Sequence, residues 1–338
     1  ATPINGAVML RFYSRTIGLV TMKRIFCGLL CLALCCASLP VCGDNAVVVP
    51  VNIFGDGNPD NGIEDSREQL MGARRNGGSV RDQRPSAGTL KCDGKVRGTA
   101  VVVDTRGFAS DLKGVVLATA AHVLYDLETQ GRFRRCNFHF LALGELPAYR
   151  AKVDMKRIVT GGFDPASITS GVEFGEGDWA FLYLPSAWKY FNPDETLVPR
   201  EFSFSQTESF QQTGGEFKLV AYDSDARVIS ESRQCSIIES SGDDLGGGAW
   251  KGQLLDDCDS TGGASGGGIV AVHDQQQYLI GIRSGAHWSE EQFPASEYPQ
   301  GPPDGSVWNS HFNTNFGRAI DVRLLRALDG FVQSIERL

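Results

Sequence analysis

The stretch Cys258-Asp-Ser-Thr-Gly-Gly-Ala-Ser265-Gly-Gly-Gly-Ile-Val-Ala-Val272 places one serine among glycines, directly before an apolar run. Glycine has no side chain, so such a loop lets backbone N–H groups come close to a reacting atom. The apolar run is short, rich in β-branched residues and without helical periodicity, which indicates a β-strand. The stretch therefore predicts a serine held in a tight loop that leads into a strand.

Two further segments complete a possible catalytic set. Leu117-Ala-Thr-Ala-Ala-His122 is an apolar strand that ends on a histidine, and Gly177-Asp178-Trp-Ala-Phe-Leu182 opens an apolar strand with an acid. Each alone has an ordinary structural explanation, as a core histidine, a turn-forming acid or a flexible loop. Together they supply a hydroxyl nucleophile, an imidazole that accepts its proton and a carboxylate that orients the imidazole. We expect these roles for Ser265, His122 and Asp178.

The serine loop also fits the G-x-S-x-G nucleophile elbow of α/β-hydrolases, which makes an esterase of that class an alternative. An elbow joins a strand to a helix, whereas Gly268 is followed by a strand-like run. The elbow's histidine also follows its serine, but the best-defined histidine, His122, precedes Ser265. The order histidine, aspartate, serine belongs to the chymotrypsin arrangement.

Short β-like runs extend outward from these motifs in two series separated by a looser stretch near 192–199. Turn residues divide the runs and no long helical pattern intervenes, which predicts two packed β-barrels or sandwiches. Apolar residues at helical spacing after Asp321, a plausible N-cap, predict a carboxy-terminal helix packed on the second barrel. The runs are 96–104, 114–122, 136–143, 151–159 and 178–185, then 217–224, 226–232, 235–240, 267–274 and 278–285.

Met22-Lys23-Arg24 and the apolar run Ile25–Val41 predict a signal peptide, cleaved after Ala37 or Gly43. Residues 1–43 would then be upstream residues and signal peptide, and the protein would be secreted or periplasmic. An uncleaved anchor is the alternative, but the run is shorter than the roughly 20 residues that span a bilayer, so we expect no stable membrane association after cleavage. Residues 44–87 are polar and indicate an extended lead or a pro-segment.

Net charge and cysteine spacing limit the partners. The 338 residues carry a net charge of −8, which argues against nucleic acid. Beyond the leader only four cysteines remain, and in an exported chain an even number indicates disulfides. Locality favours Cys92–Cys136 and Cys235–Cys258 among the three possible pairings. A zinc site is the alternative, but close Cys/His spacing is lacking, so we expect no metal and no cofactor.

The segments ATAAH (118–122), GDWAFL (177–182), GGASGGG (262–268) and GIRSGA (281–286) resemble the trypsin-like serine peptidases with the chymotrypsin fold. Within them, the serine loop is most similar to that of the bacterial glutamyl-endopeptidase-like branch. The resemblance implies two packed six-stranded antiparallel Greek-key β-barrels with a C-terminal α-helix. It divides the chain into 88–195, with His122 and Asp178, and 196–338, with Ser265 and the helix.

The resemblance also implies an exported serine endopeptidase that cleaves polypeptide substrates through an acyl-enzyme. The N–H groups of Gly263 and Ser265 would form the oxyanion hole, and the edge of Ser284, Gly285 and Ala286 would pair with substrate. Asp259 and Arg283 match positions that line the primary specificity pocket. They would select a basic or an acidic side chain, or would pair with each other and leave a neutral pocket.

Two further points follow from the resemblance. A catalytically inactive relative that serves as a binding protein is the remaining alternative, although such relatives usually lose a member of the triad, and all three members are present. Ala264 stands where animal zymogens carry an aspartate that pairs with a freed amino terminus, so activation by that ion pair is not expected.

Overall fold

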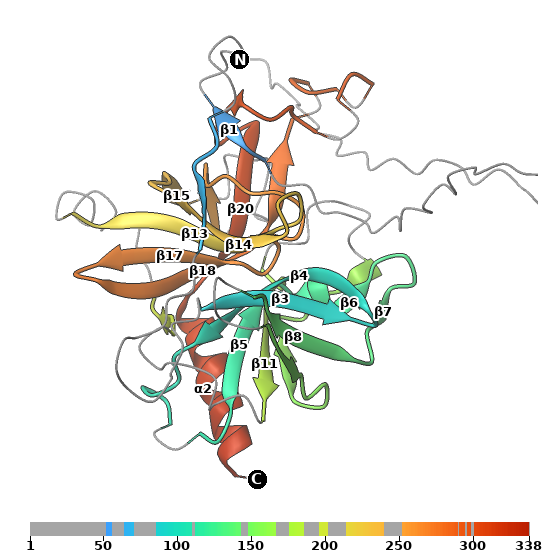
Figure 1. Ribbon diagram of the computed structural model, residues 1–338, viewed down its shortest axis with the longest axis vertical. Coiled ribbons are helices and arrows are strands. Elements are labelled where there is room, and N and C mark those ends of the chain that lie inside the picture. The colour runs from blue at the N-terminus through green and yellow to red at the C-terminus, as the bar shows by residue number, and fades with distance from the viewer. Residues whose placement is uncertain are drawn as a thin grey trace, which may run out of the picture.

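In the computed structural model, the described residues form two large, mainly antiparallel β-sheets, two small two-stranded sheets and a carboxy-terminal α-helix (Figure 1). The all-β class with a terminal helix is therefore confirmed, and the two large sheets correspond to the two halves that the sequence predicts. The residues that the structure describes are 52–55, 64–70, 86–109, 112–142, 148–166, 176–185, 196–201, 214–239, 252–289, 291–294, 296–298 and 301–337.

The first sheet has seven strands in the order β10-β11-β5-β4-β3-β8-β9. β5 and β11, which are rich in Val, Leu, Ala and Phe, are buried along their whole length. A 3-10 helix, η2 (Ala121–Leu124), follows β5 and precedes the small ladder of β6 (Tyr125–Asp126) and β7 (Gly131–Arg132). The strands are β3 (Ala87–Cys92), β4 (Lys95–Val103), β5 (Val115–Thr119), β8 (Cys136–Phe140), β9 (Tyr149–Lys152), β10 (Ile158–Thr160) and β11 (Ala180–Leu184).

The second sheet has nine strands in the order β15-β16-β20-β18-β17-β13-β14-β2, with β12 paired to β18. Its long central strand, β18, lies between β17 and β20. The strands are β2 (Arg67–Gln69), β12 (Val198–Pro199), β13 (Glu216–Asp223), β14 (Val228–Arg233), β15 (Ile237–Glu239), β16 (Gln253–Asp256), β17 (Gly268–His273), β18 (Gln276–Trp288) and β20 (Asn313–Ala319).

The strand numbers differ from the six expected in each half. In the first sheet the run 151–159 is two strands, because a turn in which Arg157 N–H donates to Asp154 O separates β9 from β10. In the second sheet the additional strands include β2 and β12, which have only three and two residues. Such short strands have too few residues for an alternating pattern that a sequence could display.

The polar lead contributes to the second half of the fold. β1 (Phe54–Gly55) pairs in parallel with β19 (Ser306–Val307), and β2 pairs with the edge strand β14. Figure 1 shows these blue amino-terminal strands beside the yellow and orange strands of the second sheet. The boundary predicted at residue 88 falls within β3, one residue after its start at Ala87.

The terminal helix α2 (Val322–Glu336) begins as predicted but also contacts the first half of the fold. Its N-cap Asp321 accepts hydrogen bonds from the backbone N–H groups of Arg323 and Leu324. The buried side chains of α2 belong to an apolar cluster that includes residues of both sheets, and Gln333 donates to Phe108 O of the first half at 3.2 Å. The expected packing on the second barrel is therefore incomplete, because α2 also lies beside the first sheet. Figure 1 shows this position, which the sequence did not predict because helical periodicity marks a buried face without saying what covers it.

Both predicted disulfides are confirmed. Cys92–Cys136 joins β3 to β8, and Cys235–Cys258 joins the start of the β15 segment to the loop after β16. Each bond therefore lies within one sheet region, as locality suggested. None of the described helices is long and apolar enough to cross a membrane.

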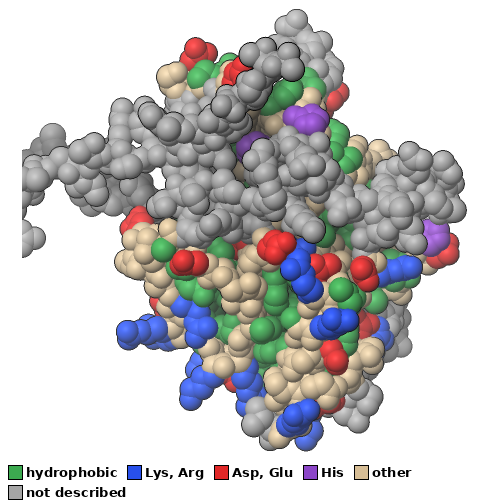
Figure 2. Space-filling view, turned by 180° about the vertical axis from the view of Figure 1, so that it is seen from behind, with side chains coloured by type: hydrophobic (Ala, Val, Ile, Leu, Met, Phe, Trp, Pro, Cys, Tyr) green, Lys and Arg blue, Asp and Glu red, His purple; other side chains and the backbone are tan. Residues whose placement is uncertain are grey.

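The surface seen from behind has mixed charge. Figure 2 shows Lys and Arg side chains interspersed with Asp and Glu over the lower half, around a strip of apolar surface. Figure 1 places the first sheet and α2 in this half. In this half of the described surface, positive and negative side chains are therefore intermixed.

Replacing the helix cap tests the role of Asp321. Asp321→Ala removes the acceptor for two helix N–H groups and a partner of buried Arg318 at 2.5 Å. We expect the free energy of unfolding in urea to fall by about 1–2 kcal/mol. Asp329→Ala, at an exposed position on the same helix, should change it by less than about 0.5 kcal/mol. Equal effects of the two changes would contradict the capping role.

Candidate active site

His122 follows strand β5, Asp178 precedes strand β11, and these two strands are paired. β5 ends at Thr119, which lies opposite Ala180 at the start of β11, so the residues just beyond both positions are neighbours. His122 Nδ1 lies 2.8 Å from Asp178 Oδ2 and 3.1 Å from Oδ1, and the His122 backbone N–H donates to Oδ1 at 2.9 Å. The imidazole and the carboxylate are thus aligned by three contacts.

The pair of His122 and Asp178 is buried. Asp178 is fully buried and His122 is 5% exposed. The Phe163 ring lies 6.4 Å from the imidazole, and Gly161 approaches Trp179 so closely that a Cβ there would fall 2.4 Å from the indole nitrogen. When Nδ1 of a neutral imidazole carries the proton toward the carboxylate, Nε2 is left as the acceptor. That tautomer is the one a general base requires.

Ser265 lies in the loop before β17 and is 5% exposed. Its hydroxyl donates to Ser284 O at 3.3 Å, which places it beside β18. Two further backbone bonds fix the loop on the same strand, from Gly266 N–H to Arg283 O and from Arg283 N–H to Gly267 O. The loop of Ser265 is therefore held against strand β18 of the second sheet.

The backbone of the serine loop has a fixed orientation. Gly262 O accepts the N–H of Ser224 at 2.9 Å, and Ala264 O accepts the N–H of Gly267 at 2.8 Å. In a planar trans peptide the next N–H points away from the carbonyl, so these bonds also set the directions of the Gly263 and Ser265 N–H groups. Neither of these two N–H groups donates to another acceptor in the described part of the chain. Gly263 has a φ of 96°, a conformation that favours glycine.

Thr99 on β4 joins the first sheet to this loop. Its N–H donates to Ser265 O at 2.8 Å, and its hydroxyl donates to Gly263 O at 2.8 Å while accepting the Tyr222 N–H. Its own carbonyl accepts the hydroxyl of Thr119, three residues before His122. One buried residue thus connects the serine loop with the end of the histidine strand.

Glycines allow this contact to be close. A Cβ on Gly98 would lie 2.6 Å from Ser265 O and 2.8 Å from Val123 Cγ2, and one on Gly266 would lie 2.2 Å from Thr119 Oγ1. Such separations are not tolerated, so larger residues would push the two segments apart. The serine loop therefore packs directly on the residues that flank His122.

The segment Ser284–Ala286 lies at a partly open strand edge. β18 pairs with β17 only as far as Ile282, while its other side continues to pair with β20. Beyond Ile282, no strand of the described residues pairs with the edge of β18 that β17 occupies up to that residue. A register shift between Arg283 and Gly285 bends the strand at this point. An extended peptide could add to such an edge.

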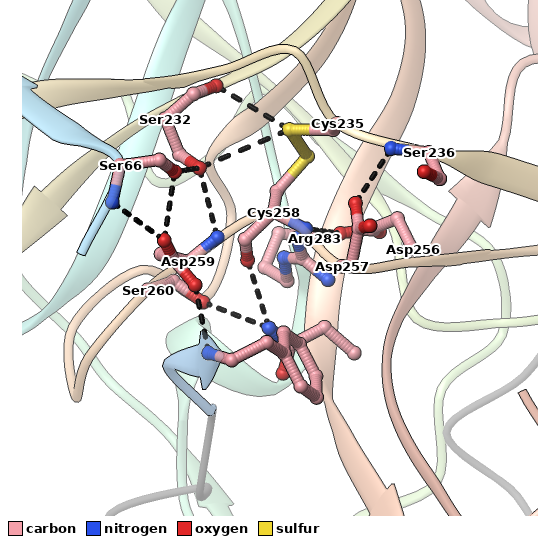
Figure 3. The surroundings of a disulfide bond; sticks show 12 residues. Ser66, Ser232, Cys235, Ser236, Asp256, Asp257, Cys258, Asp259, Ser260 and Arg283 are labelled. Carbon is pink, nitrogen blue, oxygen red and sulfur yellow. Dashed lines mark hydrogen bonds and ion pairs between the residues drawn. A yellow bond between two sulfur atoms is a disulfide. The ribbon is translucent and has the colours of Figure 1, made fainter. Parts of the chain in front are cut away.

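Asp259 and Arg283, the candidates for the specificity pocket, do not pair with each other. Arg283 Nη2 donates to Asp256 Oδ1 at 2.5 Å, and both side chains are fully buried (Figure 3). Asp259 instead accepts hydrogen bonds from Phe54 and Ser66 of the lead. Of the three alternatives for these residues, the one in which Asp259 and Arg283 pair with each other is therefore not what the structure shows. Arg283 is paired with Asp256, and Asp259 is hydrogen-bonded by the lead.

Several buried polar atoms at and around the Arg283–Asp256 pair have no hydrogen-bond partner within the part of the chain that the structure describes. They are Arg283 Nε and Nη1, Asp256 Oδ2 and Ser284 Oγ. Buried groups of this kind normally bind water or a ligand. Among the described residues no group of three His, Cys, Asp or Glu side chains could hold a metal ion.

Sequence reasoning missed two residues of this site. Asp256 gave no signal beyond belonging to an acidic pair, and Thr99 looked like an ordinary strand residue. Both contact residues that are distant along the chain, and single-sequence patterns do not report such contacts.

No protein-family model matches the chain, and no curated protein matches it significantly. Among solved structures, a Glu endopeptidase in complex with MPD is 12% identical, with a TM-score of 0.49 over 81% of this chain and 98% of the other. The thermostable serine protease AL20 of an extremophilic microorganism is 15% identical, with a TM-score of 0.45 over 74% and 97%. Protease Anisep of Arthrobacter nicotinovorans is 11% identical, with a TM-score of 0.46 over 74% and 96%. At these identities and TM-scores, the names of the three structures say nothing about the activity or the substrate of this chain.

The buried Arg283–Asp256 pair can be tested by a double-mutant cycle. Arg283→Met or Asp256→Leu alone leaves one buried charge without its partner, and we expect each to lower the free energy of unfolding by about 3–5 kcal/mol. The double variant should be less destabilised than either single variant, because no charge remains. Urea unfolding of the four proteins gives the coupling energy, and additive effects would contradict the pair.

Proposed function

We propose that this protein is an exported serine endopeptidase that uses Ser265, His122 and Asp178. The observation that carries the proposal is the buried, aligned His122–Asp178 pair, packed through Thr119 and Thr99 against the loop of Ser265. The predicted signal peptide and the two disulfides support export.

In the first half-reaction, Ser265 Oγ attacks the carbonyl carbon of a peptide bond and His122 Nε2 takes the hydroxyl proton. Asp178 keeps the imidazole in the required tautomer and stabilises the imidazolium. The N–H groups of Gly263 and Ser265 donate to the developing oxyanion. The C–N bond then breaks, the imidazolium gives its proton to the leaving amine, and an ester to Ser265 remains.

In the second half-reaction, water replaces the amine. His122 takes a proton from the water as it attacks the ester carbonyl, and returns that proton to Ser265 Oγ when the acid leaves. The same two N–H groups stabilise the second oxyanion. The substrate backbone would extend along the Ser284–Ala286 edge of β18, which places its scissile carbonyl beside the serine.

A catalytically inactive binding protein is the second candidate. It would use the same strand edge without chemistry. The geometry favours the enzyme, because a binding protein has no need of a buried carboxylate that receives both N–H groups of His122.

Substituting the nucleophile tests the proposal. Ser265→Ala removes one hydroxyl and should abolish hydrolysis of a casein substrate while leaving the far-ultraviolet circular dichroism unchanged. His122→Ala should be about as damaging, since residues that act as a unit lose activity non-additively. A fluorophosphonate should label Ser265 in the native protein and should fail to label the Ser265→Ala variant. Retention of more than about 1% of activity in Ser265→Ala would refute the assignment, because single losses typically cost several orders of magnitude.

Thr99→Val tests whether the contact between the sheets orients the oxyanion donors. Valine keeps the shape but removes the hydroxyl that bonds Gly263 O and Tyr222 N–H. We expect kcat to fall about 10-fold with little change in KM, less than the 10²–10³-fold loss of a whole oxyanion donor. Thr99→Ser, which keeps the hydroxyl, is the matched control and should retain most of the activity. A Val variant as active as the Ser variant would contradict this role.

A further inference from the structure

The lead lies directly on the serine loop. Three of its groups, the Phe54 N–H, the Ser66 N–H and the Ser66 hydroxyl, donate to the Asp259 carboxylate at 2.8, 2.7 and 2.7 Å. Asp259 is six residues before Ser265 and only 4% exposed. Figure 3 shows the Ser66 and Asp259 side chains facing one another beside the Cys235–Cys258 disulfide.

These hydrogen bonds, and not a positively charged side chain, stabilise the buried Asp259 carboxylate. Burial raises the pKa of the Asp259 carboxyl, and the hydrogen bonds from Ser66 and Phe54 oppose that effect. No salt bridge to Asp259 is formed within the described residues. A chain without the lead would leave this carboxylate buried with three fewer donors, a costly arrangement.

Arg67 makes a second connection, one residue further along. Its guanidinium binds both oxygens of Asp65, the carboxylates of Asp223 and Asp225, and the hydroxyl of Thr261 in the serine loop. Against the effect of burial, the hydrogen bonds from Arg67 lower the pKa of Asp225 to about 2, so this pair is ionised near neutral pH.

The positions of these partners connect Arg67 to the oxyanion hole. Asp223 and Asp225 flank Ser224, whose N–H holds Gly262 O, and Thr261 O accepts the N–H of Ala264. The Gly262–Gly263 peptide carries the Gly263 N–H and is held by Ser224 and by the turn at Thr261. Arg67 binds the residues on both sides of Ser224 and the hydroxyl of Thr261, so it holds both of these segments. The pairing of β2 with β14, in which Arg67 lies opposite Ser232, sets the register of the clamp.

We propose that residues 52–55 and 64–70 stay on the mature protein as an internal clamp of the serine loop, with Arg67 as a positioning residue and Asp259 as an anchor for the lead rather than a selector of substrate charge. This rests on the proposed function. The clamp would order the loop without a newly freed amino terminus, for which the buried Ala264 offers no carboxylate.

Kinetics of full-length variants test the clamp. Arg67 touches no substrate, so Arg67→Ala should lower kcat about 10-fold and leave KM within about twofold, since it disturbs donors used in the transition state. Arg67→Lys keeps the positive charge but lacks the planar guanidinium that binds several acceptors at once, so it should give an intermediate kcat. Arg106→Ala, which removes an arginine paired with Asp104 on the first half, is the control and should leave kcat unchanged. Equal kcat in all four proteins would overturn the proposal.

A second measurement is independent of catalysis. In a Ser265→Ala background, Arg67→Ala and Arg67→Lys should raise amide hydrogen exchange in residues 259–267, and Arg106→Ala should not. If the native protein fails to react with a fluorophosphonate but this exchange pattern holds, the proposed function fails and the clamp stands. Unchanged exchange with a reactive Ser265 would overturn the clamp alone.

The processed protein gives the third readout. Mass mapping of the active, secreted form should find residues 52–70 still present after its leader is removed. A fully active form that begins after Leu70 would overturn the proposal.

Discussion

The contact of Thr99 with the serine loop is the constraint on which the candidate site depends. His122 and Asp178 come from the first sheet, and Ser265 comes from the second, so neither sheet holds a triad by itself. The Thr99 N–H to Ser265 O bond and the Thr119 hydroxyl to Thr99 O bond connect the two at that point. A backbone bond between buried groups has little freedom to lengthen, because unpaired buried polar groups are costly.

The glycines follow from the same constraint. Gly98 and Gly266 both lie at the junction of the sheets, where a Cβ on Gly98 would collide with Ser265 O and one on Gly266 with Thr119 Oγ1. The glycines around Ser265 thus have two effects. Gly263 leaves its N–H group accessible, and Gly266 lets the two sheets come into close contact. A loop selected only for flexibility would not need the second property.

The sequence predicted those features that lie within short segments. The longer strands, the Asp321 cap and the three motifs were each visible in a few neighbouring residues, and both disulfides followed from the cysteine count and the separation of the cysteines along the chain. What it missed depends on distant residues: Arg283 pairs with Asp256, and Asp259 is bound by the lead. The packing of α2 was predicted incompletely for a related reason, since periodicity identifies a buried face but not its partner. Whether Ser265, His122 and Asp178 act together stays a prediction.

Three buried aspartates of this structure differ in the group that faces the carboxylate, and that group decides what each aspartate can do. Asp256 faces the guanidinium of Arg283, which stays charged, so that pair can only be structural or bind a ligand. Asp259 faces backbone and hydroxyl donors, which fix a segment of chain in place. Asp178 alone faces an imidazole, the side chain that accepts and returns a proton in the proposed mechanism. In that mechanism the Asp178–His122 pair is therefore the one among the three that takes part in proton transfer.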